Sequence, residues 1–409
     1  MKPMALIAGG GIGGLAAALA LNRAGWAAQV FEQAGMFAEV GAGIQLGPNV
    51  TRQLHAWGLT AALEGVAAFP HQLQVRDAAS GRMLGELPLG RRSIEHYGAP
   101  YATIHRADLH QLLLHAVQAQ GDVAWHLGTQ VHDFDDGAQA VEVTAQRTTQ
   151  DATVLPPYTA KGELMVGADG VWSQVRQHLL QDGPARPTGH LAYRALVAQA
   201  DLPLGLRSHQ VTVWLGPHLH VVDYPVRASE ARNIVAFLEG PPPADPRDWD
   251  HQATAAQLQA AMKYLSGPLQ ALMEAVTATT QAAGSGWRLW ALNNRPPMRG
   301  PDEHARGRVA LVGDAAHPML PYLAQGAGMA IEDAACLGSV IQRRDLGVPE
   351  RLRLYAEQRW QRNARVQARA MRNGVIFHAT GPVRWGRDLA MRALGARLLD
   401  MPWLYGGPT

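Results

Sequence analysis

The feature that most constrains the fold of this 409-residue chain is a run of glycines close to its start. Gly9-Gly10-Gly11-Ile12-Gly13-Gly14 follows the apolar stretch Met4 to Ala8 and precedes an alanine- and leucine-rich stretch that reaches Ala24. A second apolar stretch, Ala28 to Glu32, comes next. Short apolar stretches on both sides of a glycine turn and a helical pattern predict strand, turn, helix and strand. This order is typical of the opening of a parallel α/β sheet.

Three of these glycines, Gly9, Gly11 and Gly14, have the spacing G-x-G-x-x-G. In this motif the first glycine permits the tight turn, the second lets a pyrophosphate approach the backbone, and the third lets the helix pack closely on the strand. The free N–H groups at the start of the helix attract phosphate. Glu32 ends the second strand, where a carboxylate can accept hydrogen bonds from ribose hydroxyls. The motif predicts a dinucleotide site but does not distinguish NAD from FAD, and a glycine-rich turn without a ligand is the alternative.

Composition narrows the class of partner. The net charge is only +2 and the basic residues are scattered, which argues against nucleic acid and favours a small-molecule partner. The single cysteine, Cys336, excludes an internal disulfide and thiol-pair chemistry and fits a reducing compartment. Glycines interrupt the apolar N-terminal run, and no window offers the roughly 20 uninterrupted apolar residues of a membrane-spanning helix. We expect a cytoplasmic protein.

Two further motifs follow the glycine turn. Leu164 to Arg176 reads LMVGADGVWSQVR and places Asp169 at the end of a strand; Arg308 to Asp333 reads RVALVGDAAHPMLPYLAQGAGMAIED and places Asp314 at the end of another. With these three motifs in this order, the chain resembles the FAD-dependent aromatic hydroxylases of the para-hydroxybenzoate hydroxylase superfamily over about residues 4–375. The resemblance is greatest to the branch that contains salicylate, 3-hydroxybenzoate and 6-hydroxynicotinate hydroxylases.

The residues themselves support a flavin site. The carboxylate of Asp314 can bind the ribityl hydroxyls of a flavin. A helix that begins at Gly326 would direct its N–H groups toward the negative charge of a reduced flavin. The resemblance places Arg106 near the FAD ribose or pyrophosphate, with a surface ion pair to Asp108 as the alternative. The residues expected to contact the cofactor are Gly9, Gly11, Gly14, Glu32, Gln45, Arg106, Val131, Asp169, Asp314, Pro321, Gly326, Ala327 and Gly328.

The segment GAGIQLGPN, residues 41–49, also matches the branch and would bring Gln45 toward the isoalloxazine, although Gly41 and Gly43 could equally be ordinary turn residues. Because only one G-x-G-x-x-G occurs, the resemblance implies bound FAD and an NADH or NADPH donor that binds transiently. It further implies that reduced flavin and O2 form a C4a-hydroperoxide that hydroxylates a small aromatic ring. The alternatives are another flavoprotein oxidoreductase of the same fold, an oxidase or a reductase, and a non-catalytic flavin-binding regulator.

The substrate is expected between the flavin and the antiparallel part of the chain. Strand alternation places His220, Val222 and Tyr224 on one face of Leu219 to Pro225. A phenolic ring becomes more nucleophilic when it is deprotonated, so we predict His220 as the catalytic base and Tyr224 as a hydrogen-bonding partner, both in contact with the substrate. The alternative is a histidine whose hydrogen bonds are satisfied within the sheet. Further candidates for substrate contact are Tyr322, Tyr101 and Tyr193, and Arg194 is a candidate for binding a carboxylate.

The expected fold class is α/β: a Rossmann-like FAD-binding lobe with an inserted, mainly antiparallel β-sheet substrate lobe and a C-terminal helix. Alternating residues over 71–100 and 190–240 predict the antiparallel sheet, and Thr254 to Val276 predicts a helix. An arginine-rich amphipathic helix from Pro349 is either a solvated face or a homodimer contact. The predicted division is 1–70, 101–185 and 296–375 for the FAD-binding domain, 71–100 and 186–295 for the substrate-binding domain, and 376–409 for a C-terminal helical extension.

Overall fold

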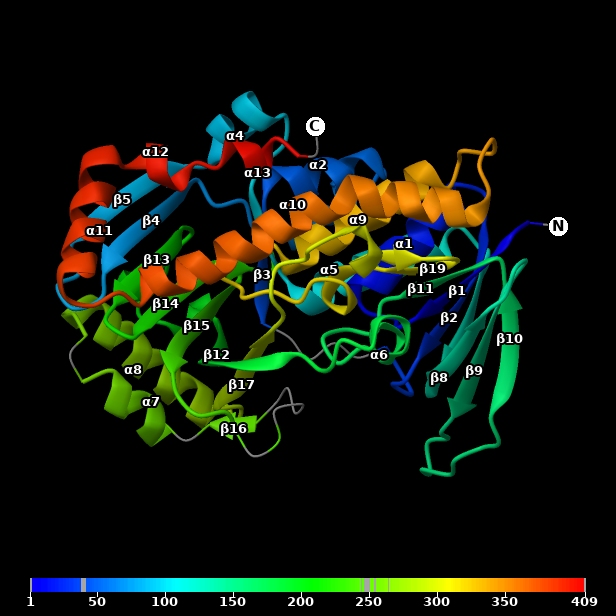
Figure 1. Cartoon of the computed structure of the whole chain (residues 1–409). Helices are drawn as coiled ribbons and strands as arrows, with labels where there is room; N and C mark the ends of the chain where they lie inside the picture. The colour runs from blue at the N-terminus through cyan, green and yellow to red at the C-terminus, as the bar shows by residue number, and fades with distance from the viewer. Residues whose placement is uncertain are drawn as a thin grey trace. The chain divides into compact units, whose positions relative to one another are not determined.

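The computed structural model describes residues 2–37, 42–243, 245, 251–253, 255–263 and 265–407. The chain forms two compact units (Figure 1). Unit 1 comprises Met1–Glu39, Leu109–Arg186 and Asn293–Ala370, and unit 2 comprises Val40–Asp108, Pro187–Leu292 and Met371–Thr409. Residues 40–70 and 101–108 belong to unit 2, as do residues 371–409. The predicted division into domains stays a prediction. The assignment of one unit to cofactor and the other to substrate stays a prediction.

A mainly parallel sheet forms the centre of unit 1. Its strand order is β18-β19-β11-β1-β2-β7, and only the edge strand β18 runs antiparallel. The predicted opening of the sheet is confirmed, because β1 (Met4–Ala8), α1 (Ile12–Arg23) and β2 (Ala27–Glu32) follow one another. The other strands are β7 (Val123–Leu127), β11 (Leu164–Gly167), β18 (Ala305–Arg306) and β19 (Val309–Leu311).

Helices α1 and α9 (Gly326–Val340) pack against each other in unit 1 (Figure 1). A Cβ at Gly338 would lie 2.9 Å from the Cβ of Ala20, so small residues permit this close packing. A second sheet of β8 (Thr129–Asp136), β9 (Val141–Arg147) and β10 (Tyr158–Gly162) shares a hydrophobic cluster with the first. Helix α6 (Gln174–Leu180) packs on β8. Helix α5 (Arg106–Gln118) begins in unit 2 and continues in unit 1.

An eight-stranded sheet with the order β16-β17-β12-β15-β14-β13-β4-β5 forms unit 2. One face of this sheet packs against α8, and the shared core contains Tyr193, Trp214, Met273 and Trp287. The strands are β4 (Gln72–Asp77), β5 (Met83–Pro88), β12 (Arg186–Ala198), β13 (Val211–Gly216), β14 (Leu219–Val226), β15 (Ala231–Glu239), β16 (His251–Ala253) and β17 (Trp287–Asn294). The prediction of a mainly antiparallel sheet is confirmed.

Three local expectations need correction. Strands β13 and β4 pair in parallel, because the chain forms other elements between them. Residues 90–97 form helix α4 (Gly90–Tyr97) rather than strand. The helix expected over 254–276 is two helices, α7 (Ala255–Ala261) and α8 (Gly267–Ala282), and α8 starts anew with Pro268 in its first turn. A proline there lacks only an N–H that a helix start leaves unpaired, so Gly267-Pro268 favours a new helix.

The remaining elements include the two-stranded antiparallel sheet of β3 (Gly43–Leu46) and β6 (Ala102–His105), and the helices α2 (Pro48–Ala56) and α3 (Thr60–Val66). The arginine-rich helix from Pro349 is confirmed as α10 (Val348–Phe377). Three shorter helices follow it: α11 (Gly381–Leu394), α12 (Ala396–Leu399) and α13 (Pro402–Tyr405). Within the described part of the chain, no helix has the length and apolar character to cross a membrane.

Candidate active site

The β1–α1 turn of unit 1 requires glycine at two of its positions. Gly9 has φ +103°, a conformation that side chains disfavour, and a Cβ at Gly14 would lie 1.9 Å from the carbonyl oxygen of Gly9. Gly11 is the N-cap of α1, and no side chain of the described residues caps that helix start. The first N–H groups of α1 are therefore available to an anion such as pyrophosphate.

Glu32 lies beside this turn because β2 pairs in parallel with β1. Its Oε2 accepts a hydrogen bond from the Gly10 amide at 2.7 Å, and its Oε1 accepts one from the Ala34 amide at 2.8 Å. These contacts hold the turn, and each carboxylate oxygen keeps a second lone pair that can accept from a hydroxyl. The arrangement fits the predicted ribose contact, which stays a prediction.

Asp169 lies two residues after the end of β11 and organises the start of α6. Its Oδ1 accepts from the Ser173 hydroxyl at 2.6 Å, and its Oδ2 accepts from the amides of Gln174 and Val175 at 2.7 and 3.1 Å. Ser173 caps α6 by accepting from the Arg176 amide at 2.8 Å. Asp169 thus shapes the loop at the end of β11, which is adjacent to β1 in the sheet.

Asp314 lies in a short 3-10 turn, Gly313–Ala315, directly after β19. Asp333 of α9 holds this turn, because its Oδ2 accepts from the Gly313 amide at 3.1 Å and contacts His317 Nε2 at 2.5 Å. His317 is fully buried, and its Nδ1 has no hydrogen-bond partner among the described residues. A buried polar atom close to Asp314 therefore remains available to a bound group.

Asp333 belongs to a buried charge network that the sequence analysis did not identify. Arg359 of α10 donates from Nε to Asp333 Oδ1 at 2.8 Å and from Nη1 to Glu332 Oε2 at 2.9 Å. Burial opposes ionisation of Asp333, but His317 and Arg359 outweigh it and lower the pKa of this carboxyl strongly. The sequence did contain a signal for this network: Glu332 and Asp333 are consecutive acidic residues in an otherwise apolar helix. Buried carboxylates require a charged or hydrogen-bonding partner.

The start of α9 has the features expected for a flavin contact. No side chain among the described residues caps it, and its first turn contains no acidic residue. A Cβ at Gly326 would meet no described heavy atom within 4 Å, so there is space at this helix start. Gly326, Ala327 and Pro321 are partly exposed, whereas Gly328 and Tyr322 are buried. The side chain of Val131 lies in the hydrophobic cluster of unit 1, so the predicted contact of Val131 would have to come from its backbone.

Unit 1 therefore holds Val131 and ten more of the thirteen predicted cofactor residues. These ten lie at or after the carboxyl ends of β1, β2, β11 and β19 and at the starts of α1 and α9. The carboxyl ends of adjacent parallel strands are where such folds bind dinucleotides. The glycine cradle, the two uncapped helix starts and the orphaned His317 nitrogen fit FAD. When bound, reduced FAD supplies the activation of O2 that ring hydroxylation requires.

The other two cofactor candidates, Gln45 and Arg106, lie in unit 2. Gln45 of β3 accepts a hydrogen bond at Oε1 from the Tyr101 hydroxyl at 2.5 Å. Arg106 begins α5, and its amide donates to the Ala42 carbonyl at 3.1 Å. Gly41 lies outside the described residues. Gly43 is more than a turn residue, because a Cβ there would lie 2.7 Å from the ring of Tyr224.

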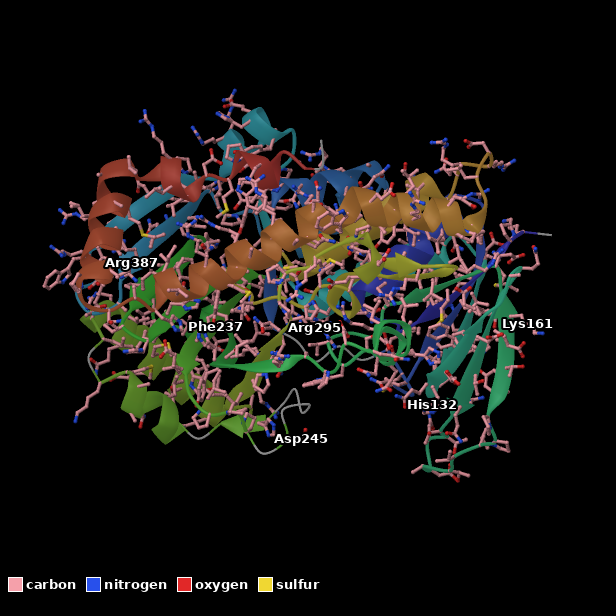
Figure 2. The ribbon with its side chains drawn as sticks, viewed as in Figure 1. His132, Lys161, Phe237, Asp245, Arg295 and Arg387 are labelled. Carbon is pink, nitrogen blue, oxygen red and sulfur yellow. The ribbon has the colours of Figure 1, made fainter. Side chains whose placement is uncertain are left out.

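His220 and Tyr224 lie on one face of β14, as predicted. The His220 side chain is 1% exposed and stacks on Phe237 of β15, which Figure 2 labels, with ring centroids 4.5 Å apart. Burial, followed by the neighbouring His378 and His190, lowers the pKa of His220 well below its ordinary value. Burial raises the pKa of Tyr224, whose hydroxyl donates to the Gly43 carbonyl at 2.6 Å. Both groups are therefore neutral near pH 7.

The register of the sheet separates the remaining substrate candidates. Arg194 of β12 is opposite Val235, and Val235 is opposite Val222, so Arg194 shares the face of His220 and Tyr224. Its guanidinium lies over the ring of Trp290, 5.1 Å from the centroid. Tyr193 is the next residue along β12 and points to the opposite face, into the core beneath α8. The structure thus does not bring Tyr193 together with His220.

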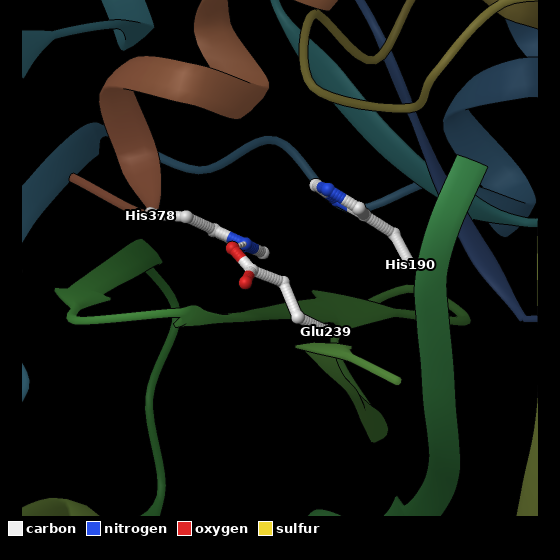
Figure 3. A group of neighbouring side chains, drawn as sticks. All are labelled: His190, Glu239 and His378. Carbon is white, nitrogen blue, oxygen red and sulfur yellow. Dashed lines mark hydrogen bonds and ion pairs between the residues drawn. The ribbon is translucent and has the colours of Figure 1, made fainter. Parts of the chain in front are cut away.

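A cluster of imidazoles and one carboxylate adjoins His220. His220 Nδ1 lies 2.8 Å from His378 Nε2, and His378 Nδ1 lies 3.2 Å from Glu239 Oε1. Figure 3 shows the Glu239 carboxylate directed at the His378 ring. His218 contacts the other oxygen of Glu239 at 2.8 Å, and the His190 ring stacks on His378 with centroids 4.8 Å apart. The sequence offered no signal for this cluster, because its members come from four separate segments.

The chain is similar to known FAD-dependent proteins over almost its whole length. The FAD-binding domain family matches residues 3–370. The chain is 36% identical over 403 residues to a 3-hydroxybenzoate 6-hydroxylase of Polaromonas naphthalenivorans (strain CJ2), covering 98% of this chain and 95% of that protein. It is 34% identical over 378 residues to a 6-hydroxynicotinate 3-monooxygenase of Bordetella bronchiseptica (strain ATCC BAA-588 / NCTC 13252 / RB50), covering 90% of each. The crystal structure of Klebsiella pneumoniae HpxO complexed with FAD and uric acid has a TM-score of 0.81 at 26% identity, covering 97% of this chain and 94% of that one.

The chain therefore belongs to the FAD-binding domain family, and the predicted relationship to the FAD-dependent aromatic hydroxylases is confirmed. Within that family it is an FAD-dependent aromatic monooxygenase, as predicted.

Proposed function

We propose that this monooxygenase uses NADH or NADPH and O2 to hydroxylate a small aromatic acid that carries a phenolic hydroxyl. The observation that carries the proposal is the shared face of His220, Tyr224 and Arg194 on the sheet of unit 2. The face combines a neutral imidazole, a neutral phenol and a guanidinium, which suit a phenol at one end of a ring and a carboxylate at the other. The names of the relatives support the same substrate class.

His220 is proposed as the base that accepts the phenolic proton. Its lowered pKa keeps the imidazole neutral near pH 7, so one ring nitrogen has a lone pair that can accept a proton. The same shift makes His220 a weaker base, so the accepted proton must be passed on. Tyr224 already donates its proton to the Gly43 carbonyl, so toward a substrate its hydroxyl oxygen is an acceptor. Tyr224 would thus orient the substrate hydroxyl rather than ionise.

Arg194 is proposed as the residue that binds the carboxylate. Strands β12 and β14 are separated by β15, so Arg194 lies about two strand spacings, roughly 10 Å, from the strand of His220. The guanidinium lies over Trp290 of β17, on the side of β12 away from β14, so the side chain would have to turn toward β15 to reach the carboxylate of a substrate that contacts His220. In that position a guanidinium can bind a planar carboxylate bidentately.

Two other features of the proposal concern partners. The nicotinamide donor binds transiently, because the chain has one G-x-G-x-x-G, which unit 1 uses for the proposed FAD site.

The protein also forms a homodimer through α10 and α11, where several large apolar side chains are exposed. Cytoplasmic location stays a prediction from the cysteine content and the N-terminal sequence.

The test is a panel of 3-hydroxybenzoate, salicylate, 6-hydroxynicotinate and benzoate, with NADH and NADPH oxidation measured and the product identified by mass. We expect at least one phenolic acid to stimulate oxidation and to gain one oxygen atom, and benzoate to give no hydroxylated product. His220→Ala should lower the rate of product formation by about 100-fold or more, the contribution of a general base. Bound FAD should keep its wild-type spectrum.

Arg194→Gln is the companion variant. We expect it to raise KM for the phenolic acid more than it lowers kcat, because it removes binding energy rather than the base. Hydroxylation by His220→Ala at the wild-type rate would exclude His220 as the base. NAD(P)H oxidation that yields peroxide and no hydroxylated product with every phenolic acid would instead indicate an oxidase, the alternative considered above.

A further inference from the structure

The neighbours of His220 form a continuous line of titratable groups that reaches the surface of unit 2. His220 is 1% exposed and His378 is 5% exposed, whereas the side chain of Glu239 is 41% exposed. The two contacts in this line are His220 Nδ1 to His378 Nε2 at 2.8 Å and His378 Nδ1 to Glu239 Oε1 at 3.2 Å. Each distance is within hydrogen-bond range, and the line runs from the interior to solvent.

The tautomers of this line follow from its carboxylate end. An ionised carboxylate only accepts hydrogen bonds, so His378 Nδ1 donates to Glu239. In a neutral His378 the Nε2 atom is then the acceptor, and His220 Nδ1 donates to it. His220 is left with Nε2 as its acceptor nitrogen, which is the form a base requires. Burial works against ionisation of Glu239, but hydrogen bonds from His218 and His378 outweigh it and lower the pKa of this carboxyl, which is consistent with the ionised form.

We infer that His378 and Glu239 form a relay that carries the proton accepted by His220 to solvent. The inference rests on the proposed function, in which His220 deprotonates the substrate hydroxyl. The phenolic proton binds to His220 Nε2, the Nδ1 proton of His220 moves to His378 Nε2, and the Nδ1 proton of His378 moves to Glu239. The substrate becomes a phenolate, and Glu239 becomes a carboxylic acid that releases its proton to water. Each imidazole is then neutral in the opposite tautomer, and transfer of a proton in the reverse direction restores the starting form.

The environment explains why such a relay is required. A protonated His220 would be buried next to the imidazoles of His378 and His190, so a proton cannot remain there at low cost. The groups that face His378 are His190 of β12, His218 of the β13–β14 turn and Glu239 of β15. From α11, the Arg387 guanidinium, labelled in Figure 2, donates to the carbonyls of Ile376 and Phe377. Glu239 is the one carboxylate in contact with His378 among the described residues.

A metal ion is a weaker explanation of the same cluster. Ligand atoms of His190, Glu239 and His378 lie within 4.8 Å of one another, and their types would suit zinc. However, the rings of His190 and His378 stack with an angle of 7° between their planes. Imidazole lone pairs lie in the ring plane, so nitrogens in two stacked, nearly parallel planes do not converge on one ion. The hydrogen-bonded line requires no such rearrangement.

The decisive measurement is proton release on substrate binding to the oxidised FAD enzyme, without turnover. The substrate is the phenolic acid identified by the panel, and a pH indicator in weak buffer is followed by stopped flow. We expect wild type to release a proton rapidly. His378→Gln retains hydrogen-bonding groups but cannot relay a proton, and should slow the release by about tenfold or more. His378→Gly should be restored in part by added imidazole, which a structural defect would not be.

Glu239→Gln tests the exposed end, where a change should not affect folding. We expect slower release that becomes dependent on buffer concentration. His218→Gln is the matched control, because His218 contacts the same carboxylate but lies outside the line. The rate of proton release by His218→Gln should stay within twofold of the wild-type rate. If His378→Gln and Glu239→Gln release protons as fast as wild type, or if wild type releases none, the relay is wrong. Loss of hydroxylation in His220→Ala would in that case still support the proposed function.

Discussion

Two neighbouring glycines in the first turn of α1, Gly13 and Gly14, differ in what their positions can accommodate. A Cβ at Gly14 would lie 1.9 Å from the Gly9 carbonyl oxygen, which is a backbone atom that cannot move aside alone. A Cβ at Gly13 would instead be in ordinary contact with side chains of Val312 and Ala330 at 3.6 and 3.7 Å. The two positions therefore provide a matched pair for testing the proposed FAD site.

We expect Gly14→Ala to bind FAD at least about tenfold more weakly, because forced overpacking costs roughly 1–3 kcal/mol and shifts the turn that faces the pyrophosphate. The dissociation constant of Gly13→Ala for FAD should stay within about twofold of the wild-type value. Flavin fluorescence on titration of the deflavinated proteins measures both constants. Wild-type FAD affinity in a folded Gly14→Ala protein would contradict the assigned pyrophosphate position.

Much of this residue-scale detail was predictable, and some was not. The steric demand for glycine at Gly9 and Gly14 follows from the motif alone. The need for glycine at Gly43 could not be predicted from the motif. The side chains that crowd this position, Tyr224 and Asn233, come from β14 and β15, far along the chain. Tyr193 was predicted to contact substrate, yet its alternation on β12 places it in the core, which only the strand register shows.

At the scale of elements, α9 and α10 are joined by the buried network around Asp333. His304 belongs to it: Leu311 O lies 3.1 Å from His304 Nδ1, and Asn363 Nδ2 lies 2.8 Å from His304 Nε2. The carbonyl accepts and the amide donates, so the imidazole is held as a neutral tautomer. Burial lowers the pKa of His304 to about 3, which means that the folded state resists protonation of this group.

The sign of the resulting pH dependence follows from linkage. Between about pH 3 and the ordinary value of 6.5, the unfolded chain binds a proton at His304 and the folded chain does not, so the free energy of unfolding falls as pH decreases below 6.5. We expect His304→Gln to flatten this dependence between pH 6.5 and 4, because the amide does not titrate. Urea unfolding at several pH values measures it. If the free energy of unfolding changes equally with pH in wild type and in His304→Gln, then His304 does not contribute to the pH dependence.

At the scale of the whole molecule, the unexplained feature is the apolar surface of α10 and α11. Trp385, Leu389 and Val383 of α11 are 73%, 68% and 64% exposed, and Val375 of α10 is 74% exposed. Exposed apolar side chains grouped in this way are typical of association surfaces. The amphipathic pattern of the sequence left a solvated face and a dimer contact as alternatives, and the exposure favours the contact.

If a second copy covers this surface, Trp385→Asp should convert the dimer into monomer at micromolar concentration, because a charge would be buried at the interface. Sedimentation velocity distinguishes the two masses. Trp403→Phe, a tryptophan change elsewhere in the same unit, serves as the control and should leave the sedimentation unchanged. A wild-type protein that sediments as a monomer would exclude the dimer.

The sequence by itself determined the family, the parallel sheet that opens the chain, and the three motifs that surround the proposed cofactor. These depend on local patterns: glycine spacing, apolar periodicity and a carboxylate at a strand end. Only the tertiary structure decided the partners of His220, the network of Asp333 and the face on which Arg194 lies. The physical reason is that strand register and the packing of distant segments bring these groups into contact, and a local pattern carries no information about either.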